Sequence, residues 1–275
     1  MSMNIIEERR EENLWFEIGA SSMIGGRHYQ QDFGYIYTGK QEAAAVVCDG
    51  MGGMEGGERA SRTAVELFAG DLHKEEPIMD PSGFLYREAA RMDLAVAGLK
   101  GSDGRLLKSG TTLAAVYCRG NQMYWVSVGD SMIYRIRGNS IEPVNLVHNY
   151  RTMLQEQLAE GSITKEFYER EEKTPQAEAL TSYLGMNHLY RVETGKEPFS
   201  LEPGDMILLC SDGVYKSMDQ YQILAMVRDN DLDMKIAAER TTAMALQYGG
   251  KRQDNTTVIL MKYREKQEEA GWFVV

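Results

Sequence analysis

The sequence predicts an α+β fold in which antiparallel sheets are covered on the outside by helices. Apolar runs of strand length gather together along the chain, and helical segments also come in groups. This order favours separate sheet and helix layers over a repeated βαβ unit. Short turns connect neighbouring runs, as at Gly120-Asn121 and Gly129-Asp130. Such turns join antiparallel strands, because a parallel pair needs a long crossover.

The expected strands are short runs rich in Val, Ile, Tyr and Trp and bounded by Gly, Asn or Asp. They are residues 33–38, 43–48, 112–118, 123–128, 131–137, 206–211 and 256–263. Gly39-Lys40 separates the first two runs, and Pro203-Gly204 precedes the run 206–211. Turn residues therefore stand where the strand pattern requires them.

Helical periodicity marks segments that lie between these runs. In residues 84–100, apolar side chains recur at spacings of three and four and form one stripe. The stripe consists of Leu85, Ala89, Met92, Val96 and Leu99. Residues 58–70 and 232–247 show a similar pattern, and residues 217–228 show a less regular one. The predicted order is strands, two helices, strands, a mixed segment, a strand, two helices and a strand.

The mixed segment, residues 148–200, is polar and rich in Glu and Gln. It contains an expected helix near 150–160 and no clear strand. We interpret it as an excursion, a flap, on a single domain of residues 1–275, because the chain has neither a solenoid repeat nor a low-complexity linker.

The composition limits the partners of the protein. The chain has 275 residues, with 41 Asp and Glu against 30 Lys and Arg, so its net charge is −11. This balance argues against nucleic acid, whose binding needs surplus cations. No apolar run approaches the roughly 18 residues of a membrane span, and early charged residues break any signal-peptide core. The odd set Cys48, Cys118 and Cys210 favours reduced, buried thiols and a cytoplasmic location.

Aspartates fall at the boundaries of several expected strands. They are Asp32, Asp49, Asp130, Asp212 and Asp254. If runs 33–38 and 43–48 form a hairpin, Asp32 lies opposite Asp49, and antiparallel pairing can bring the others to the same edge. Each aspartate alone is also common at a turn. Crowded carboxylates repel one another unless protonated or bound to cations, and such hard oxygen ligands suit Mg²⁺ or Mn²⁺.

A glycine-rich segment, DGMGGMEGGERAS at residues 49–61, begins at one of these aspartates and leads into an expected helix. Its glycines let the backbone approach a ligand closely, and the Gly50 carbonyl can coordinate a hard cation. The segment lacks the lysine motif of a P-loop. A flexible loop without a ligand is the alternative interpretation.

Short motifs occur along the chain in a fixed order. They are R-x-x-x-Q-D at 27–32, DGMGG at 49–53, SGTT at 109–112, SVGDS at 127–131, SDG at 211–213 and DN at 254–255. In this order and spacing they resemble the metal-dependent protein serine/threonine phosphatases of type 2C, the PPM family, in its bacterial single-domain form. The resemblance spans about residues 20–263.

The resemblance implies a four-layer α-β-β-α sandwich, with two antiparallel sheets flanked by helix pairs and a dinuclear Mn²⁺ or Mg²⁺ centre at one edge. By motif position, Asp49 would bridge both ions and the Gly50 carbonyl would complete one site. Asp212 and Asp254 would hold the other ion. Asp32 would orient metal-bound waters.

Arg27 would clamp the substrate phosphate, although a lone arginine is usually a solvated surface cation. Two neighbouring cations lower the pKa of a water, which then attacks phosphorus without a covalent intermediate. The expected substrates are phosphoserine and phosphothreonine in proteins modified by a Ser/Thr kinase, which implies a role in signalling. A cysteine-dependent mechanism is rejected, because none of the cysteines is followed by five residues and then arginine.

The chain departs from the family pattern at three places. Met51 stands where eukaryotic relatives carry a histidine general acid, so no residue is assigned to protonate the leaving group, and His28 is only a neighbour of Arg27. Lys216 stands where many members carry an acidic ligand for a weak third metal, whose partner would be Asp130. We therefore expect that third site to be weakened or absent. The third departure is the divergent segment 148–200, where substrate choice is expected to lie.

Two alternatives stay open. The first is a catalytically weak pseudophosphatase that acts as a binding or regulatory module, for which Lys216 is the only support. The second is another dinuclear hydrolase, such as a nuclease or a small-molecule phosphatase. The net charge of −11 argues against a nuclease.

Overall fold

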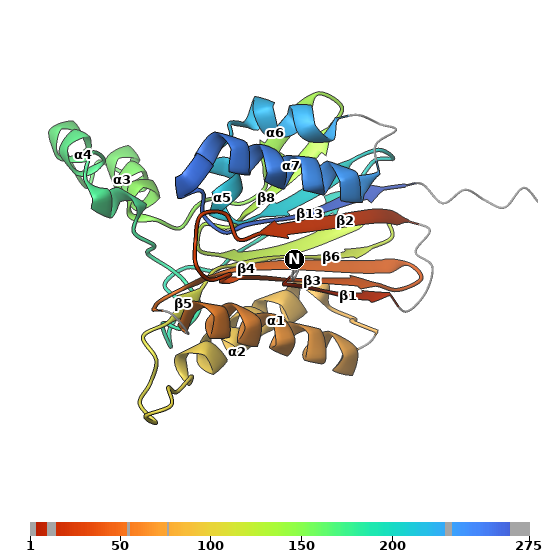
Figure 1. Cartoon of the computed structure of the whole chain (residues 1–275), viewed down its shortest axis with the longest axis horizontal. Coiled ribbons are helices and arrows are strands. Elements are labelled where there is room, and N and C mark those ends of the chain that lie inside the picture. Colours follow the sequence, from red (N-terminus) through yellow and green to blue (C-terminus); the bar gives the residue numbers. More distant parts are fainter. Residues whose placement is uncertain (1–3, 10–14, 54–55, 76, 229–232, 265–275) are drawn as a thin grey trace, which may run out of the picture.

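Four layers, helices, sheet, sheet and helices, make up the computed structural model (Figure 1). It describes residues 4–9, 15–53, 56–75, 77–228 and 233–264. Two residues of the glycine-rich segment, 54–55, and the first residue of the expected helix 232–247 lie outside the described residues. The described layers confirm the predicted fold class, an α-β-β-α sandwich.

The first sheet has the strand order β1-β3-β4-β6-β7-β10, and two short strands pair with β4 and β7. Its strands are β1 (Ile5–Arg9), β3 (Asp32–Thr38), β4 (Glu42–Met51), β5 (Gly110–Thr111), β6 (Leu113–Arg119), β7 (Gln122–Val128), β10 (Glu193–Thr194) and β11 (Phe199–Ser200). The expected hairpin is present as β3 and β4. The β1–β3 pair differs from the prediction because it is parallel. Its strands are joined through β2 of the other sheet, so the chain returns in the same direction.

The second sheet has the order β2-β13-β12-β8-β9, and each neighbouring pair is antiparallel. Its strands are β2 (Phe16–Met23), β8 (Met132–Arg137), β9 (Ser140–Pro143), β12 (Met206–Cys210) and β13 (Thr256–Tyr263). The strand β2 was not predicted, because its centre is Gly19-Ala20-Ser21-Ser22, which lacks β-branched and aromatic residues.

Burial on both faces explains why these strands appear as continuous apolar runs. In β4, Ala44, Val46 and Cys48 point to the helix layer. The alternate residues Ala43, Ala45 and Val47 point between the two sheets. The same alternation in β12 places Ile207 and Leu209 between the sheets and Leu208 against the other helices. The three cysteines are free and buried, as predicted.

The outer layers are two helix pairs. Helices α1 (Gly56–Lys74) and α2 (Pro81–Ala97) cover the first sheet, and α6 (Gln220–Val227) and α7 (Met234–Gly249) cover the second. The predicted stripe of α2 is buried against the first sheet from Leu85 to Val96. Asp80 caps α2 by accepting a hydrogen bond from the Gly83 N–H, and Pro81 occupies the first turn.

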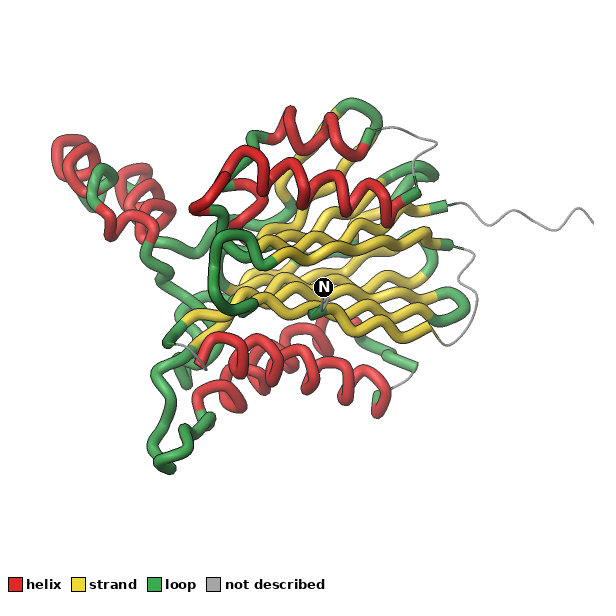
Figure 2. The backbone as a smooth tube through the Cα atoms, viewed as in Figure 1, coloured by secondary structure: helices red, strands yellow, loops and turns green. Residues whose placement is uncertain are grey.

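The first part of the flap, with its two helices, projects from one end of the layers (Figures 1 and 2). Its last part returns to the first sheet as β10 and β11, which pair with β7, so the expectation that this segment has no strand is wrong. The flap contains α3 (Tyr150–Ala159), near the expected helix, together with α4 (Lys165–Glu171) and the 3₁₀ turn Pro175–Glu178. A short helix, α5 (Asp212–Tyr215), and a second 3₁₀ turn, Gly250–Arg252, lie near β12 and β13 in the sequence. No helix in the described residues is long and apolar enough to cross a membrane.

Candidate metal centre

The predicted pairing of Asp32 with Asp49 is present in the sheet register, where the two residues are opposite each other in β3 and β4. The backbone of Asp49 is fixed by two threonines of the SGTT motif. Its N–H donates to Thr112 Oγ1 at 2.9 Å, and its carbonyl accepts from Thr111 Oγ1 at 2.9 Å. These two threonines therefore support the backbone of the proposed ligand.

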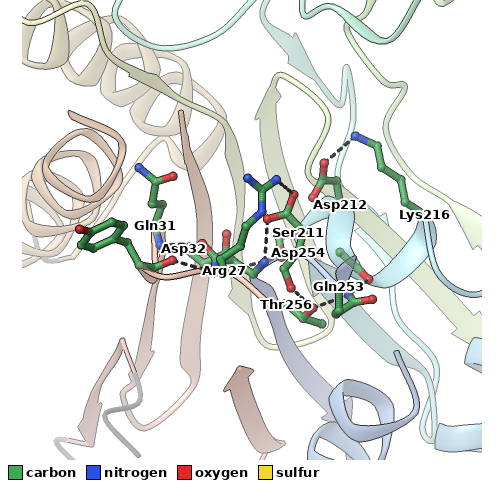
Figure 3. Close-up of polar contacts among 12 residues, drawn as sticks. Arg27, Gln31, Asp32, Ser211, Asp212, Lys216, Gln253, Asp254 and Thr256 are labelled. Atoms are coloured by element: carbon green, nitrogen blue, oxygen red, sulfur yellow. Dashed lines mark hydrogen bonds and ion pairs between the residues drawn. The ribbon is translucent and has the colours of Figure 1, made fainter. Parts of the chain in front are cut away.

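A serine connects this pair to the second sheet. Ser211 Oγ donates to Asp32 Oδ2 at 2.7 Å and accepts from the Thr257 N–H at 3.0 Å. The side chain of Ser211 is fully buried. Because Asp212 follows Ser211 directly and begins α5, this bond places carboxylates from both sheets at the same edge (Figure 3).

Arg27 and Asp254 form an ion pair, with Arg27 Nη2 2.5 Å from Asp254 Oδ2. The next residue, Asn255, fixes the loop that carries the arginine. Its side-chain amide donates to the carbonyls of Ile24 and Tyr29, and its Oδ1 accepts from the Gln31 N–H at 2.8 Å. The R-x-x-x-Q-D and DN motifs are therefore held against each other.

Lys216 lies between the remaining two aspartates. Its ammonium is 2.5 Å from Asp212 Oδ2 and 3.4 Å from Asp130 Oδ2. These two carboxylates raise the pKa of Lys216, and together they outweigh the opposing effect of its burial. A fixed cation therefore lies at the position where the family pattern predicts a ligand for a third ion.

The electrostatics of this edge indicate an excess of negative charge. Burial, together with the charges of Asp212 and Asp254, raises the pKa of Asp32 from 3.8 to about 7, although Ser211 and Thr257 oppose the shift. Burial and the neighbouring carboxylates also raise the pKa of Asp49 well above 3.8, and that of Asp130 rises for the same reasons. Such a cluster is stabilised by protons or by cations.

Gly50 lies where a side chain has no room. A Cβ atom at this position would be 2.1 Å from the Gly57 carbonyl oxygen and 2.7 Å from that of Gln31. The Gly50 N–H donates to the Gln31 carbonyl at 3.0 Å. Glycine is therefore required for β4 to pass between the arginine loop and the start of α1.

The donor chemistry of this edge fits a hard divalent cation. Asp32 Oδ1 and Asp212 Oδ1 are buried and have no hydrogen-bond partner, and carboxylate oxygens are the ligands that Mg²⁺ and Mn²⁺ prefer. Within the described ranges, no three Asp, Glu, His or Cys side chains are arranged as a ready-made ligand set. Instead, Arg27 and Lys216 pair with Asp254 and Asp212.

Comparison with known proteins identifies the family. A sequence profile described as protein phosphatase 2C matches residues 18–247. The chain belongs to the protein phosphatase 2C family. The predicted family and enzyme class, a metal-dependent phosphoprotein phosphatase that hydrolyses phosphoric monoesters, are thereby confirmed.

Bacterial relatives are similar over most of the chain. The serine/threonine phosphatase stp of Listeria welshimeri is 28% identical over 241 residues, which cover 86% of this chain and 91% of that protein. The serine/threonine protein phosphatase PstP of Mycobacterium tuberculosis is 29% identical over 225 residues, or 82% of this chain and 41% of PstP.

Solved structures show the same architecture. The crystal structure of Mycobacterium tuberculosis PstP has a TM-score of 0.73 and 27% identity, and covers 91% of this chain and 99% of that one. The catalytic domain of PstP in complex with two manganese ions has a TM-score of 0.70 and 26% identity, with 91% and 99% of the chains covered.

Two residues that build the centre, Ser211 and Asn255, were not assigned from the sequence. Both lie inside the motifs SDG and DN, where only the aspartates were assigned. A polar side chain next to a proposed ligand in a buried strand end is the signal that points to them, because a buried polar group needs a partner. Of the other residues considered, His28 is exposed and Met51 ends β4.

Proposed function

We propose that the chain hydrolyses phosphoserine and phosphothreonine monoesters of proteins at a centre of two Mn²⁺ or Mg²⁺ ions. The observation that carries the proposal is that both sheets meet at one edge. Asp32 lies opposite Asp49 there, and it accepts a hydrogen bond from the hydroxyl of Ser211, which precedes Asp212. The relatives named serine/threonine phosphatases support the substrate class. The two manganese ions in the PstP catalytic domain support the cofactor.

In this proposal, Asp49 would hold both ions and the Gly50 carbonyl would complete one site, while Asp212 and Asp254 would hold the second ion. Bound Mn²⁺ or Mg²⁺ supplies positive charge that makes a water acidic and neutralises phosphoryl oxygens. Arg27 is paired with Asp254 in this structure. If Asp254 held a metal ion instead, the Arg27 guanidinium would be available to bind the substrate phosphate.

The protein side chains then position the reactants. Arg27 donates two parallel hydrogen bonds to phosphoryl oxygens, which neutralises and orients the group. Asp32, held by Ser211, accepts a hydrogen bond from the attacking water. As the water oxygen bonds to phosphorus, the bond to the serine or threonine oxygen breaks. Met51 cannot donate a proton, so the proton that the attacking water releases passes through solvent to the leaving oxygen, and the products are inorganic phosphate and the free hydroxyl.

A catalytically weak binding module is the second candidate, and one contact favours it. The Lys216 ammonium lies on Asp212 Oδ2 and competes with a cation there. It also supports a weakened third site, because it pairs with Asp130 as well. A module of this kind would bind phosphopeptides without turning them over.

Hydrolysis of p-nitrophenyl phosphate and of a phosphothreonine peptide, with Mn²⁺ and with chelator, tests the proposal. We expect turnover only with metal and its loss in Asp49→Asn, together with weaker Mn²⁺ binding by calorimetry. Asp80→Asn is the matched control, because asparagine also caps α2. An Asp49→Asn variant as active as wild type contradicts the proposal. An inert wild type that binds the peptide establishes the binding module.

We also propose a domain organisation, a source of the substrates, a segment that sets specificity and a location. The described layers and the flap form one catalytic domain, whose substrates come from a Ser/Thr kinase. Substrate choice depends on the flap, residues 148–200. The free cysteines fit a reducing compartment, which supports a cytoplasmic location.

A further inference from the structure

A pocket of about 790 Å³ opens beside the candidate metal centre. Its floor is made by Met51 and Gly52 at the end of β4 and by Ser109 and Gly110. Its walls come from the end of α2, from residues 106–108 and from the last part of the flap, at Tyr183, Gly185 and Asn187. The size is that of a site for a small ligand or a few side chains.

Close backbone packing builds the pocket. A Cβ atom on Gly110 would be 2.4 Å from the Tyr183 ring, so the ring lies directly on this glycine. Gly185 has a φ of +108°, and a Cβ there would be 2.8 Å from the Ser109 carbonyl oxygen. The flap wall is therefore in contact with the floor.

A buried carboxylate fastens the same wall to α2. Asp93, which is 3% exposed, accepts hydrogen bonds from the backbone N–H groups of Gly185 at 2.7 Å and Asn187 at 3.2 Å. Such charge-assisted bonds hold the wall in one position. The pocket is therefore preformed.

The pocket and the metal centre share their backbone. Met51 pairs with Gly110 and Gly50 pairs with Thr111 in the β4–β5 ladder. Thr111 in turn exchanges two backbone hydrogen bonds with Leu184 of the flap, at 3.0 and 2.8 Å. One short ladder thus carries the proposed ligands Asp49 and Gly50, the pocket floor and the flap wall.

The mouth of the pocket is apolar and basic. Leu94 and Leu106, which both line the pocket, are 57% and 63% exposed. The segment 99–109 carries Lys100, Arg105 and Lys108 against one acid, Asp103. It is therefore a basic element on a chain whose net charge is −11.

We propose that this pocket binds an apolar side chain of the phosphorylated protein substrate, with an acidic residue beside it facing Lys108. The inference rests on the proposed function and deepens it. A phosphorylated residue at the metal centre places its own neighbours in the chain next to Met51 and Gly52, because both follow the proposed ligands directly. The apolar lining favours a hydrophobic side chain, and the basic segment favours an acidic neighbour.

Wild-type enzyme with Mn²⁺ and a set of phosphothreonine peptides tests the proposal first. The reference peptide has glycine at all flanking positions, and a leucine or phenylalanine is introduced at one position at a time. We expect kcat/KM to rise roughly tenfold at one or two positions, the worth of one buried apolar side chain. A glutamate next to that position raises it further.

Two variants assign this preference to the pocket. Leu106→Asp places a charge at the mouth, and we expect the ratio of kcat/KM between the apolar and the glycine peptide to fall to about one. Lys108→Glu retains the apolar preference and abolishes the further rise in kcat/KM that the neighbouring glutamate gives. The matched control is Leu246→Asp on α7, a partly exposed leucine outside the pocket lining, which keeps both ratios at their wild-type values.

The outcomes separate this inference from the proposed function. A wild type that hydrolyses every peptide at the same kcat/KM overturns the pocket inference and leaves the phosphatase proposal standing. A preference that survives in Leu106→Asp, in a variant with wild-type circular dichroism, also overturns it. A wild type with no metal-dependent turnover of p-nitrophenyl phosphate contradicts the proposed function instead.

Discussion

A buried pair of carboxyl groups between α1 and α2 predicts how stability depends on pH. Asp71 and Glu88 are each 1% exposed. Lys74 Nζ is 2.8 Å from Asp71 Oδ1, and Arg91 Nη1 is 2.8 Å from Asp71 Oδ2 and 3.3 Å from Glu88 Oε1. Asp71 therefore has close contacts with both cations, and Glu88 has one longer contact.

The pKa values of the two carboxyl groups are shifted in opposite directions. Burial, followed by the charge of Asp71, raises the pKa of Glu88 from 4.5 to about 7. Burial alone would raise the pKa of Asp71 too, but the hydrogen bonds from Lys74 and Glu88 and the charge of Arg91 outweigh it and lower that pKa. The pair is most stable when Glu88 carries a proton and shares it with Asp71.

The sign of the pH effect follows from proton binding. Folded Glu88 keeps its proton up to about pH 7, whereas unfolded Glu88 loses it near 4.5. The folded state therefore binds more protons in this window, and stability falls as pH rises through it. Because each unit of pKa shift corresponds to about 1.4 kcal/mol, the unfolding free energy lost above pH 7 is roughly 3 kcal/mol.

Glu88→Gln tests this reasoning, since the amide keeps a donor for Asp71 at every pH. Relative to wild type, we expect the variant to gain roughly 1 kcal/mol of unfolding free energy at pH 5 and roughly 3 kcal/mol at pH 8. Urea unfolding of dilute protein with chelator measures both values, because chelation removes the stabilisation by bound metal.

Glu66→Gln is the control, because Glu66 is a carboxylate with an exposed side chain on α1, paired with Arg62 at 2.8 Å. Its effect should stay below about 1 kcal/mol and should not change with pH. A Glu88→Gln variant that is no more stable than wild type at pH 8 would refute a shared proton between Glu88 and Asp71. A difference in stability that is the same at both pH values would also refute it.

Three other substitutions test the metal centre and its support. Lys216→Asp removes the ammonium between Asp212 and Asp130, so metal-stimulated turnover should increase and calorimetry should detect an additional Mn²⁺; unchanged metal dependence counts against this. Arg27→Gln should lower kcat/KM for a phosphate ester about 10- to 100-fold, the worth of charged hydrogen bonds, and a loss below twofold would argue against the clamp. Gly50→Ala places a Cβ 2.1 Å from a backbone oxygen and should cost at least about 1–3 kcal/mol in urea unfolding of the chelated protein, whereas wild-type stability would show that β4 can shift.

The features that sequence predicted are those that neighbouring residues encode. Continuous apolar runs predicted the buried strands, and a short turn fixed the register that places Asp32 opposite Asp49. The order of the motifs then identified the family. The strand β2 was not predicted, because the small residues at its centre have low strand propensity.

Contacts between distant segments were decided only by the tertiary structure. The Ser211–Asp32 hydrogen bond joins residues 179 apart, and the Arg27–Asp254 pair joins residues 227 apart. The position of Lys216, the Glu88–Asp71 pair and the pocket likewise depend on which faces pack together. The amino-acid sequence by itself thus determined the strands with continuous apolar runs and the glycine positions, and it predicted carboxylates as the ligands. Packing of the layers decided which charges meet, because a pKa or an ion pair depends on neighbours in space.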